Sequence, residues 1–383
     1  MDVVMEQPAQ VSAFIYSPDL DAGGYPSDCQ FDSSRPGRTR RKVFQLGLLN
    51  GPNRREVAPV PVTREELEWF HTPAYLQALR LAGEGDLPVE AFAMGLGTPD
   101  CPVFKGMYDY VSLAAGGTMT GARLILREEA SVAFNPAGGF HHAMPGNCAG
   151  FCFINDVVLA AMELARAGKR VAFLDIDVHH CDGVQHAFYR RNDVMTVSLH
   201  EDGKTLFPGT GFENEIGEGD GRGYSVNIPL PVGTYDGAYI RAFEEAALPV
   251  IKAFNPDVMM VEIGMDTLAG DPLAHLHLTN NVVVEILERV LALGKPIVAT
   301  GGGGYHIENT VRGWTLAWSA LCGESAVDMI MGMGGVMLEN TDWTGGLRDR
   351  MLLSDAGRRA VVDREVNVTI GKIRKFIFPI HGL

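Results

Sequence analysis

The chain has 383 residues, of which 46% are hydrophobic and 21% are charged, proportions that are ordinary for a globular protein. Its net charge of −15 disfavours a direct nucleic-acid partner, because binding a phosphate backbone needs clustered positive charge. The six cysteines form no C-x-x-C pair, no apolar run is long enough to span a membrane, and the first ten residues lack a signal-peptide pattern. We therefore expect a cytoplasmic protein with no membrane partner.

Strand-like and helical patterns alternate along most of the chain. Residues 1–10 are expected to be a flexible terminus, and residues 19–41 a loop-like surface segment rich in Gly, Pro, Ser, Asp and Arg. The later elements are predicted as strands at 131–135, 171–179, 194–200, 224–229, 256–264 and 296–300, and helices at 153–167, 183–190, 235–254, 281–293, 310–322 and 365–376. This order predicts a single α/β domain, in which a mostly parallel sheet of about eight strands has helices on both faces. We assign 11–322 to the domain and 323–383 to a C-terminal extension packed on it.

The segment 171–179 carries the strongest chemical signal. Its apolar run ends in Asp175-x-Asp177-x-His179, and alternate side chains of a strand point to the same face. Burying two carboxylates and an imidazole together is costly unless something compensates them. A divalent metal is the favoured explanation, since zinc accepts oxygen and nitrogen ligands, and a metal-free hydrogen-bonded cluster is the alternative.

Three more predicted strands end in polar or glycine-rich sequence. They lead to His141-His142, to Asp266, and to a run of four glycines before Tyr305. Ligands bind at the carboxyl edge of open parallel sheets, so we expect these loops to converge with the acidic segment. Asp266, which alone could be a helix cap, would complete a three-ligand metal site with room for water and substrate.

The adjacent histidines His141 and His142 can divide general-base and general-acid work if their environments separate their pKa values. Asp175 and Asp182 could each accept a ring N–H and fix the tautomer. The alternative is a pair of core histidines satisfied by backbone carbonyls. Tyr305 could donate to a developing oxyanion. A dinucleotide-binding glycine turn is disfavoured there, because no third glycine stands at the required spacing.

Eight short segments strengthen this interpretation, namely Asp100–Pro102, Gly139–His142, Gly150–Asp156, Asp175–Gly183, Ser198–His200, Phe207–Gly211, Asp266–Pro272 and Gly301–Tyr305. In them the chain resembles the histone deacetylase superfamily, which includes acetoin-utilisation proteins and acetylpolyamine amidohydrolases of the arginase-deacetylase fold. The segments occur in family order across residues 12–322. The stretch 206–231 is especially similar to bacterial acetoin-utilisation-type members.

The resemblance implies a role for each matched residue at the centre of the site. One catalytic zinc, or ferrous iron in its place, would be held by Asp177, His179 and Asp266. His141 and His142 would be the acid/base pair, oriented by Asp175 and Asp182, with Tyr305 polarising the carbonyl. The sequence leaves open which histidine is the base, and His142 is the working assignment.

The resemblance also implies a substrate tunnel and up to two structural potassium ions. The expected substrate-binding residues are Asp100 at the rim, Gly150, Phe151, Phe207, Leu273 and Gly303, and Arg38 is matched to an acetate-exit channel. The expected potassium ligands are Asp175, Ser198 and backbone oxygens of Asp177, His179 and Leu199, and, at a second site, backbone oxygens near Phe188, Arg191, Val194 and Tyr224.

The implied reaction is hydrolysis of an Nε-acetyl-lysine or another short acyl-lysine, which releases acetate and the free amine. Deacetylation of a polyamine or another small amide is the alternative, although the apolar Leu273 stands where polyamine-selective relatives can carry a glutamate. A catalytically silent acyl-lysine-binding protein is the remaining alternative, disfavoured because the ligand set and Tyr305 are complete. Whether the chain forms a homo-oligomer stays open.

Overall fold

The computed structural model describes residues 11–324, 346–353 and 355–383, so the flexible terminus expected at 1–10 lies outside it. Its strands are β1 (Ser12–Ile15), β2 (Arg54–Val57), β3 (Val132–Asn135), β4 (Val171–Asp175), β5 (Val194–Glu201), β6 (Ser225–Leu230), β7 (Val258–Glu262) and β8 (Ile297–Thr300). They form one sheet in the order β2-β1-β3-β8-β7-β4-β5-β6, and every neighbouring pair is parallel. The predicted parallel α/β fold is confirmed.

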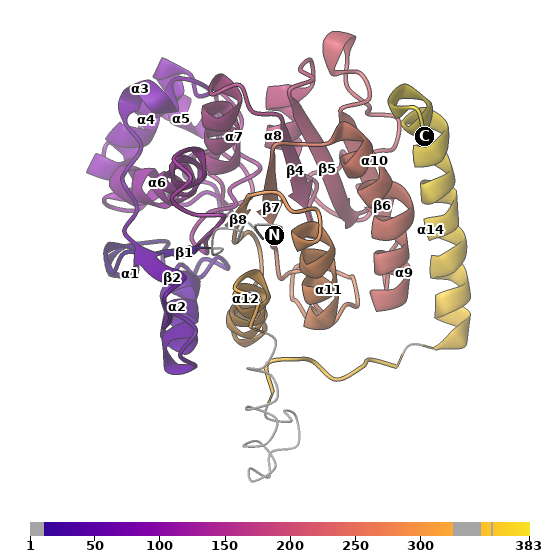
Figure 1. Cartoon of the computed structure of the whole chain (residues 1–383). Coiled ribbons are helices and arrows are strands. Elements are labelled where there is room, and N and C mark those ends of the chain that lie inside the picture. The colour runs from indigo at the N-terminus through magenta and orange to yellow at the C-terminus, as the bar shows by residue number, and fades with distance from the viewer. Residues whose placement is uncertain (1–10, 325–345, 354) are drawn as a thin grey trace, which may run out of the picture.

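The helices lie on both sides of this sheet (Figure 1). Their bounds are α1 (Asp19–Ala22), α2 (Arg35–Gln45), α3 (Arg64–Leu67), α4 (Pro73–Glu84), α5 (Val89–Ala93), α6 (Met107–Leu126), α7 (Asp156–Arg166), α8 (Asp182–Phe188), α9 (Asp236–Ala242), α10 (Leu248–Phe254), α11 (Asn280–Leu291), α12 (Ile307–Leu321) and α14 (Ala356–Phe376). Short turns η1 (Gly219–Gly221), η2 (Phe243–Ala247) and η4 (Phe378–His381) complete the described elements.

Side-chain alternation along the strands creates two hydrophobic cores. In β4, Val171 and Phe173 point into the core covered by α4, α6 and α7, whereas Ala172 and Leu174 point into the core covered by α9, α11 and α12. Strands buried on both faces are apolar throughout, as expected for a parallel sheet between helix layers. The sheet is therefore a rigid platform whose carboxyl edge is free to carry polar loops.

The long helix α6 was not predicted from sequence, and no element was predicted for residues 42–130. Small residues such as Ala114, Gly116 and Gly117 let α6 be buried nearly all round, so it lacks the amphipathic stripe that identifies a surface helix. A side chain at Gly116 would collide with the backbone of Val60. This close packing explains why the segment was missed.

Two other expectations about local structure are wrong. The loop expected at 19–41 contains α1 and the first half of α2, which begins at Arg35 with Pro36 in its first turn, a favoured helix-start position. The strand expected at 171–179 ends at Asp175, so strand alternation does not orient the residues beyond it.

The last helix, α14, is longer than the one expected at 365–376. Val362, Val366 and Ile370 bury one side of it in the second core, beside β6 and α9. Thr369 also donates a hydrogen bond to the backbone oxygen of Pro229 in β6. The boundary at 322/323 stays a prediction, and residues 325–345 and 354 of the extension lie outside the description. No helix among the described residues is long and apolar enough to cross a membrane.

Candidate metal centre

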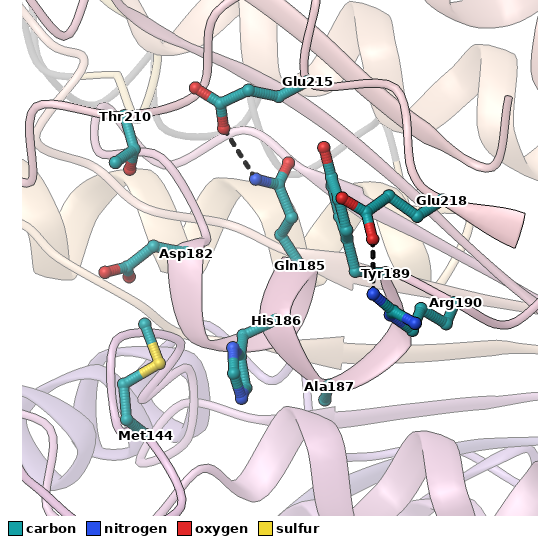
Figure 2. A pocket seen from close by; sticks show the side chains of 10 residues that line it. All are labelled: Met144, Asp182, Gln185, His186, Ala187, Tyr189, Arg190, Thr210, Glu215 and Glu218. Carbon is teal, nitrogen blue, oxygen red and sulfur yellow. Dashed lines mark hydrogen bonds and ion pairs between the residues drawn. The ribbon is translucent and has the colours of Figure 1, made fainter. Parts of the chain in front are cut away.

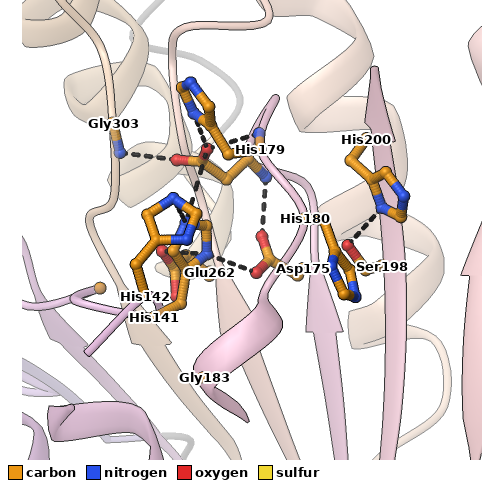
Figure 3. Close-up of polar contacts among 12 residues, drawn as sticks. His141, His142, Asp175, His179, His180, Gly183, Ser198, His200, Glu262 and Gly303 are labelled. Atoms are coloured by element: carbon orange, nitrogen blue, oxygen red, sulfur yellow. Dashed lines mark hydrogen bonds and ion pairs between the residues drawn. The ribbon is translucent and has the colours of Figure 1, made fainter. Parts of the chain in front are cut away.

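The four central strands of the sheet, β3, β8, β7 and β4, carry the candidate site. Each ends in one of the loops that were expected to converge, and the structure brings these loops together at the carboxyl edge. Figure 3 shows His141, Asp175, His179 and Gly303 grouped there. The chain order of these strands changes direction at this point of the sheet, which is where open α/β folds bind ligands.

Side-chain hydrogen bonds to the backbone help to hold the acidic segment beyond β4. Asp175 Oδ1 accepts from the backbone N–H of Asp177 at 2.9 Å, and Asp177 Oδ1 accepts from that of His179 at 2.9 Å. Asp266 Oδ1 accepts from the backbone N–H of Val178 at 3.0 Å. Asp side chains stabilise such turns well, so the spacing of two persists without a strand.

Asp177, His179 and Asp266 present ligand atoms to a common point. His179 Nδ1 lies 3.0 Å from Asp177 Oδ1 and 3.1 Å from Asp266 Oδ2, and all three side chains are buried. Asp266 Oδ2 accepts no hydrogen bond from the described residues. Gly303 donates its N–H to Asp177 Oδ2 at 2.6 Å, and a side chain at Gly303 would collide with Asp266. An oxygen–nitrogen set with a spare buried oxygen fits a divalent cation.

The pKa values at this centre reflect two carboxylates around one imidazole. Burial opposes protonation of His179, but Asp177 and Asp266 outweigh it and raise its pKa to about 10. Burial and the neighbouring Asp177 raise the pKa of Asp266 to about 7. Positive charge is therefore favoured between the two carboxylates, and a metal ion can supply it.

The histidine pair lies beside this centre. His141 Nδ1 is 2.8 Å from Asp175 Oδ2, His142 Nδ1 is 2.7 Å from Asp182 Oδ1, and the two Nε2 atoms are 3.0 Å apart. Burial opposes protonation of His141, but Asp175 outweighs it and raises the pKa to about 9. Burial and the neighbouring His141 lower the pKa of His142 to about 4. The environments thus separate the two rings as acid–base work requires.

A hydrogen bond to its backbone N–H holds Tyr305 in place. Asp271 Oδ2 accepts from the backbone N–H of Tyr305 at 2.7 Å, and the Tyr305 ring lies 5.5 Å from that of Phe151. Burial raises the pKa of Tyr305 well above its ordinary value, so its phenol keeps its proton. In the run of four glycines before Tyr305, Gly302 donates its N–H to the backbone oxygen of Gly138 at 3.0 Å. This N–H is therefore already bonded within the protein and is not free to bind a phosphate group.

Two of the residues expected to line the tunnel, Gly150 and Phe207, lie against His142. A side chain on Gly150 would come within 2.6 Å of His142 Cδ2 and 3.0 Å of Phe207, and the rings of Phe207 and His142 are 4.9 Å apart. Phe151 adopts a positive φ of 65°, an unusual conformation for a bulky residue. Asp100 stabilises this turn, because its Oδ2 accepts from the backbone N–H of Gly150 at 2.9 Å.

Comparisons with known proteins agree with this geometry. The family described as histone deacetylase domain matches residues 33–321. Acetoin utilization protein AcuC of Bacillus subtilis is 41% identical over 324 residues, which cover 82% of this chain and 82% of that protein. Histone deacetylase 8 of Xenopus laevis is 40% identical over 274 residues, which cover 71% of this chain and 84% of that protein. This chain belongs to the histone deacetylase family.

Solved structures support the same assignment. The crystal structure of an HDAC homolog from Aquifex aeolicus matches with a TM-score of 0.83 at 32% identity, covering 95% of this chain and 100% of that chain. An HDAC homolog complexed with SAHA matches equally well. The match therefore covers the whole of the compared histone deacetylase homolog and nearly all of this chain.

Arg38 was matched above to the acetate-exit channel of histone deacetylases. It is partly exposed and pairs with the exposed Glu308. Arg35, three residues earlier, is buried instead and donates to the backbone oxygen of Gly304 at 2.9 Å, with its guanidinium 4.2 Å from the Phe31 ring centroid. The first turn of α2 thus points inward at Arg35, and the channel role given to Arg38 stays a prediction.

The expected potassium ligands lie at two places in this histone deacetylase fold. Ser198 of β5 pairs in register with Asp175 of β4, although its hydroxyl is 2.7 Å from His200 Nδ1. At the second place, the backbone oxygens of Phe188 and Tyr224 each accept one backbone hydrogen bond. Both potassium sites stay predictions.

A surface pocket of about 650 Å³ lies behind the histidine pair, along α8 (Figure 2). Asp182 lines it together with Gln185 and Glu215, which are joined by a hydrogen bond of 2.8 Å. Asp182 thus contacts His142 on one side and this pocket on the other. Sequence reasoning also missed Glu262, a buried carboxyl beside His141, although a charged residue within an apolar strand is itself a signal.

Proposed function

We propose that this chain hydrolyses Nε-acetyl-lysine, or a related short acyl-lysine, to acetate and the free amine. The observation that carries the proposal is the convergence of Asp177, His179 and Asp266 beside a histidine pair whose pKa values are separated. Membership of the histone deacetylase family and the SAHA-complexed structural neighbour support an acyl-lysine substrate.

The metal would be zinc or ferrous iron, held by Asp177, His179 and Asp266. When bound, it would supply a Lewis acid and lower the pKa of a water molecule towards about 7. Structural potassium at the two predicted places would stabilise the fold. A rise in Tm with potassium that sodium does not reproduce would support those sites, and equal Tm values would contradict them.

The histidines divide the proton transfers. His142 is neutral at physiological pH because burial lowers its pKa, so its Nε2 can take a proton from the attacking water. Asp182 fixes its tautomer by binding Nδ1. His141 is protonated beside Asp175, and its Nε2 can deliver a proton to the leaving amine nitrogen.

Tyr305 donates its phenolic hydrogen to the oxyanion that develops on the acyl group. The phenol remains protonated because burial raises its pKa, so the donor is present throughout the reaction. Gly303 lies directly beside the ligands, and its lack of a side chain leaves space for the carboxylates of Asp177 and Asp266.

Phe151 and Phe207 flank the extended acyl-lysine, with Gly150 allowing the backbone to approach it and Leu273 packed near Tyr305. Asp100 contributes to the rim of this tunnel. Both of its carboxylate oxygens already accept hydrogen bonds, from Thr98 and Gly150, so it shapes the rim and offers only remaining lone pairs to a substrate amide.

Acetate release from an Nε-acetyl-lysine peptide, compared with release from an acetylated polyamine, tests the proposal. We expect faster turnover of the peptide, loss of activity with a chelator, and recovery on adding zinc or ferrous iron. Faster turnover of the polyamine would favour the alternative substrate. Full activity in metal-free protein would contradict the proposal.

A further inference from the structure

Glu262, the last residue of β7, places a second carboxyl group beside His141. Its Oε1 lies 3.1 Å from His141 Nδ1, while the same nitrogen makes its hydrogen bond to Asp175 Oδ2 at 2.8 Å. Asp175 and Glu262 pair in register across β4 and β7, so two neighbouring strands each direct a carboxyl group to one ring nitrogen (Figure 3).

The carboxyl group of Glu262 is fully buried and lacks a compensating partner. Neither of its oxygens accepts a hydrogen bond from the described residues. An ionised carboxylate in such a place costs several kcal/mol, and the nearby Asp156, Asp175 and Asp177 add repulsion. Burial, followed by these carboxylates, raises the pKa of Glu262 well above its ordinary value. Glu262 therefore presents to the His141 ring a buried oxygen that has no hydrogen-bond partner among the described residues.

We propose that Glu262 is a positioning residue for His141 and that it acts through the oxygen that lies 3.1 Å from His141 Nδ1. The inference rests on the proposed function, in which His141 delivers a proton to the leaving amine. One hydrogen bond to Asp175 leaves the imidazole free to turn about the N–H···O axis. A second oxygen at 3.1 Å restricts that rotation and keeps His141 Nε2 facing the reacting group.

Glutamate, glutamine and methionine have similar lengths at position 262 but should differ in how well they position His141. Glutamine keeps an oxygen at this place, so Glu262→Gln should retain kcat within about threefold. Methionine fills the volume without that oxygen, so Glu262→Met should lower kcat by about tenfold or more, the usual effect of losing an orienting partner. KM and bound metal should stay unchanged in both variants, because neither the tunnel nor the ligands are altered.

Thr300→Val is the matched control. Thr300 pairs in register with Glu262 on the neighbouring strand, is buried, and has a hydroxyl without a hydrogen-bond partner among the described residues. Its replacement changes a buried polar atom at the same edge of the sheet and should leave kcat as in the wild type.

Steady-state kinetics on an acetyl-lysine peptide, with metal analysis of each purified variant, decide the matter. Wild-type turnover measures the proposed function, and the ratios between variants measure the role of Glu262. A wild-type kcat in Glu262→Met would overturn the inference, as would a kcat in Glu262→Gln as low as in Glu262→Met. Two metal ions per wild-type chain, one of them lost in Glu262→Gln, would also overturn it, because His141, Asp177 and Glu262 would then be ligands.

Discussion

The floor of the site and its rim are built differently. The floor, defined as Asp177, His179 and Asp266, is buried and tied to the backbone by short hydrogen bonds. The rim, defined as Asp100 and Phe207, belongs to loops beyond the sheet, and the Phe207 side chain is 44% exposed. The floor has little freedom to change without losing its geometry, whereas the rim can vary.

This difference separates chemistry from selection of the substrate. Changes to the floor should abolish metal binding or lower kcat, because hydrogen bonds to the backbone hold its groups in one geometry. Changes to the rim should alter KM and acyl preference while bound metal is retained. The following variants test that separation, beginning with the largest expected effect.

Removing one negative ligand should have the largest effect. Asp266→Asn, like Asp177→Asn, replaces an anionic oxygen with a neutral one, and we expect loss of bound metal and a fall in kcat of about a thousandfold or more. Metal content by atomic spectroscopy and turnover are measured together. Asp257→Asn is the control, since Asp257 is exposed just before the opposite end of β7. Stoichiometric metal in both ligand variants would show that the ligand set is wrong.

Removing the phenolic hydroxyl should affect catalysis alone. Tyr305→Phe is expected to lower kcat by about a hundredfold, because losing one oxyanion donor costs about 3 kcal/mol. Metal content and KM should remain near wild type. Tyr235→Phe removes another phenol, one that donates to Asp363 of α14, and should not change kcat. Wild-type turnover in Tyr305→Phe would exclude this residue from the mechanism.

Sequence patterns predicted the fold where apolar runs had clear boundaries. β4, β7 and β8 were found because each is apolar and ends in polar or glycine-rich sequence. The helix α6 was missed because nearly complete burial removes the amphipathic pattern. β1 and β2 are only four residues long and contain polar residues, so neither differs clearly from a loop.

The candidate ligands could be proposed from sequence because their chemistry is visible in their spacing. Asp175, Asp177 and His179 keep that spacing through side-chain hydrogen bonds even though the strand ends early. Sequence alone does not tell which face of α2 is buried, so the burial of Arg35 could not be predicted. The role of Glu262 depends on strand register with Asp175, which only the sheet order reveals.

Acid should weaken the buried hydrogen bonds that support the backbone of His141. His71 is buried, its Nδ1 is 3.1 Å from the backbone oxygen of Met144, and its Nε2 accepts from the backbone N–H of Asn155 at 3.1 Å. Asn155 in turn donates to the backbone oxygen of His141. Burial lowers the pKa of His71 to about 4, below its ordinary value of 6.5. The unfolded chain therefore binds a proton more readily, and stability is lost as pH falls from 6.5 towards 4.

This loss should reach about 3 kcal/mol in the free energy of unfolding, since one pKa unit corresponds to about 1.4 kcal/mol. Urea unfolding at pH 7.5 and pH 4.5 measures it in the wild type and in His71→Gln, which does not titrate in this range. The wild type should lose more stability than the variant. Equal losses would mean that His71 does not contribute.

The smallest effect is expected at the rim. Phe207→Ala removes an aromatic ring 4.9 Å from that of His142, and such a contact contributes about 1 kcal/mol, or roughly a fivefold change in KM. Longer acyl groups should be accepted relatively better, because the tunnel is wider, while kcat on acetyl-lysine and metal content are retained. Phe44→Ala on α2, which removes a similarly exposed ring, is the control. If Phe207→Ala lowered kcat and left KM unchanged, Phe207 would act with the floor, and the separation of chemistry from selection would fail.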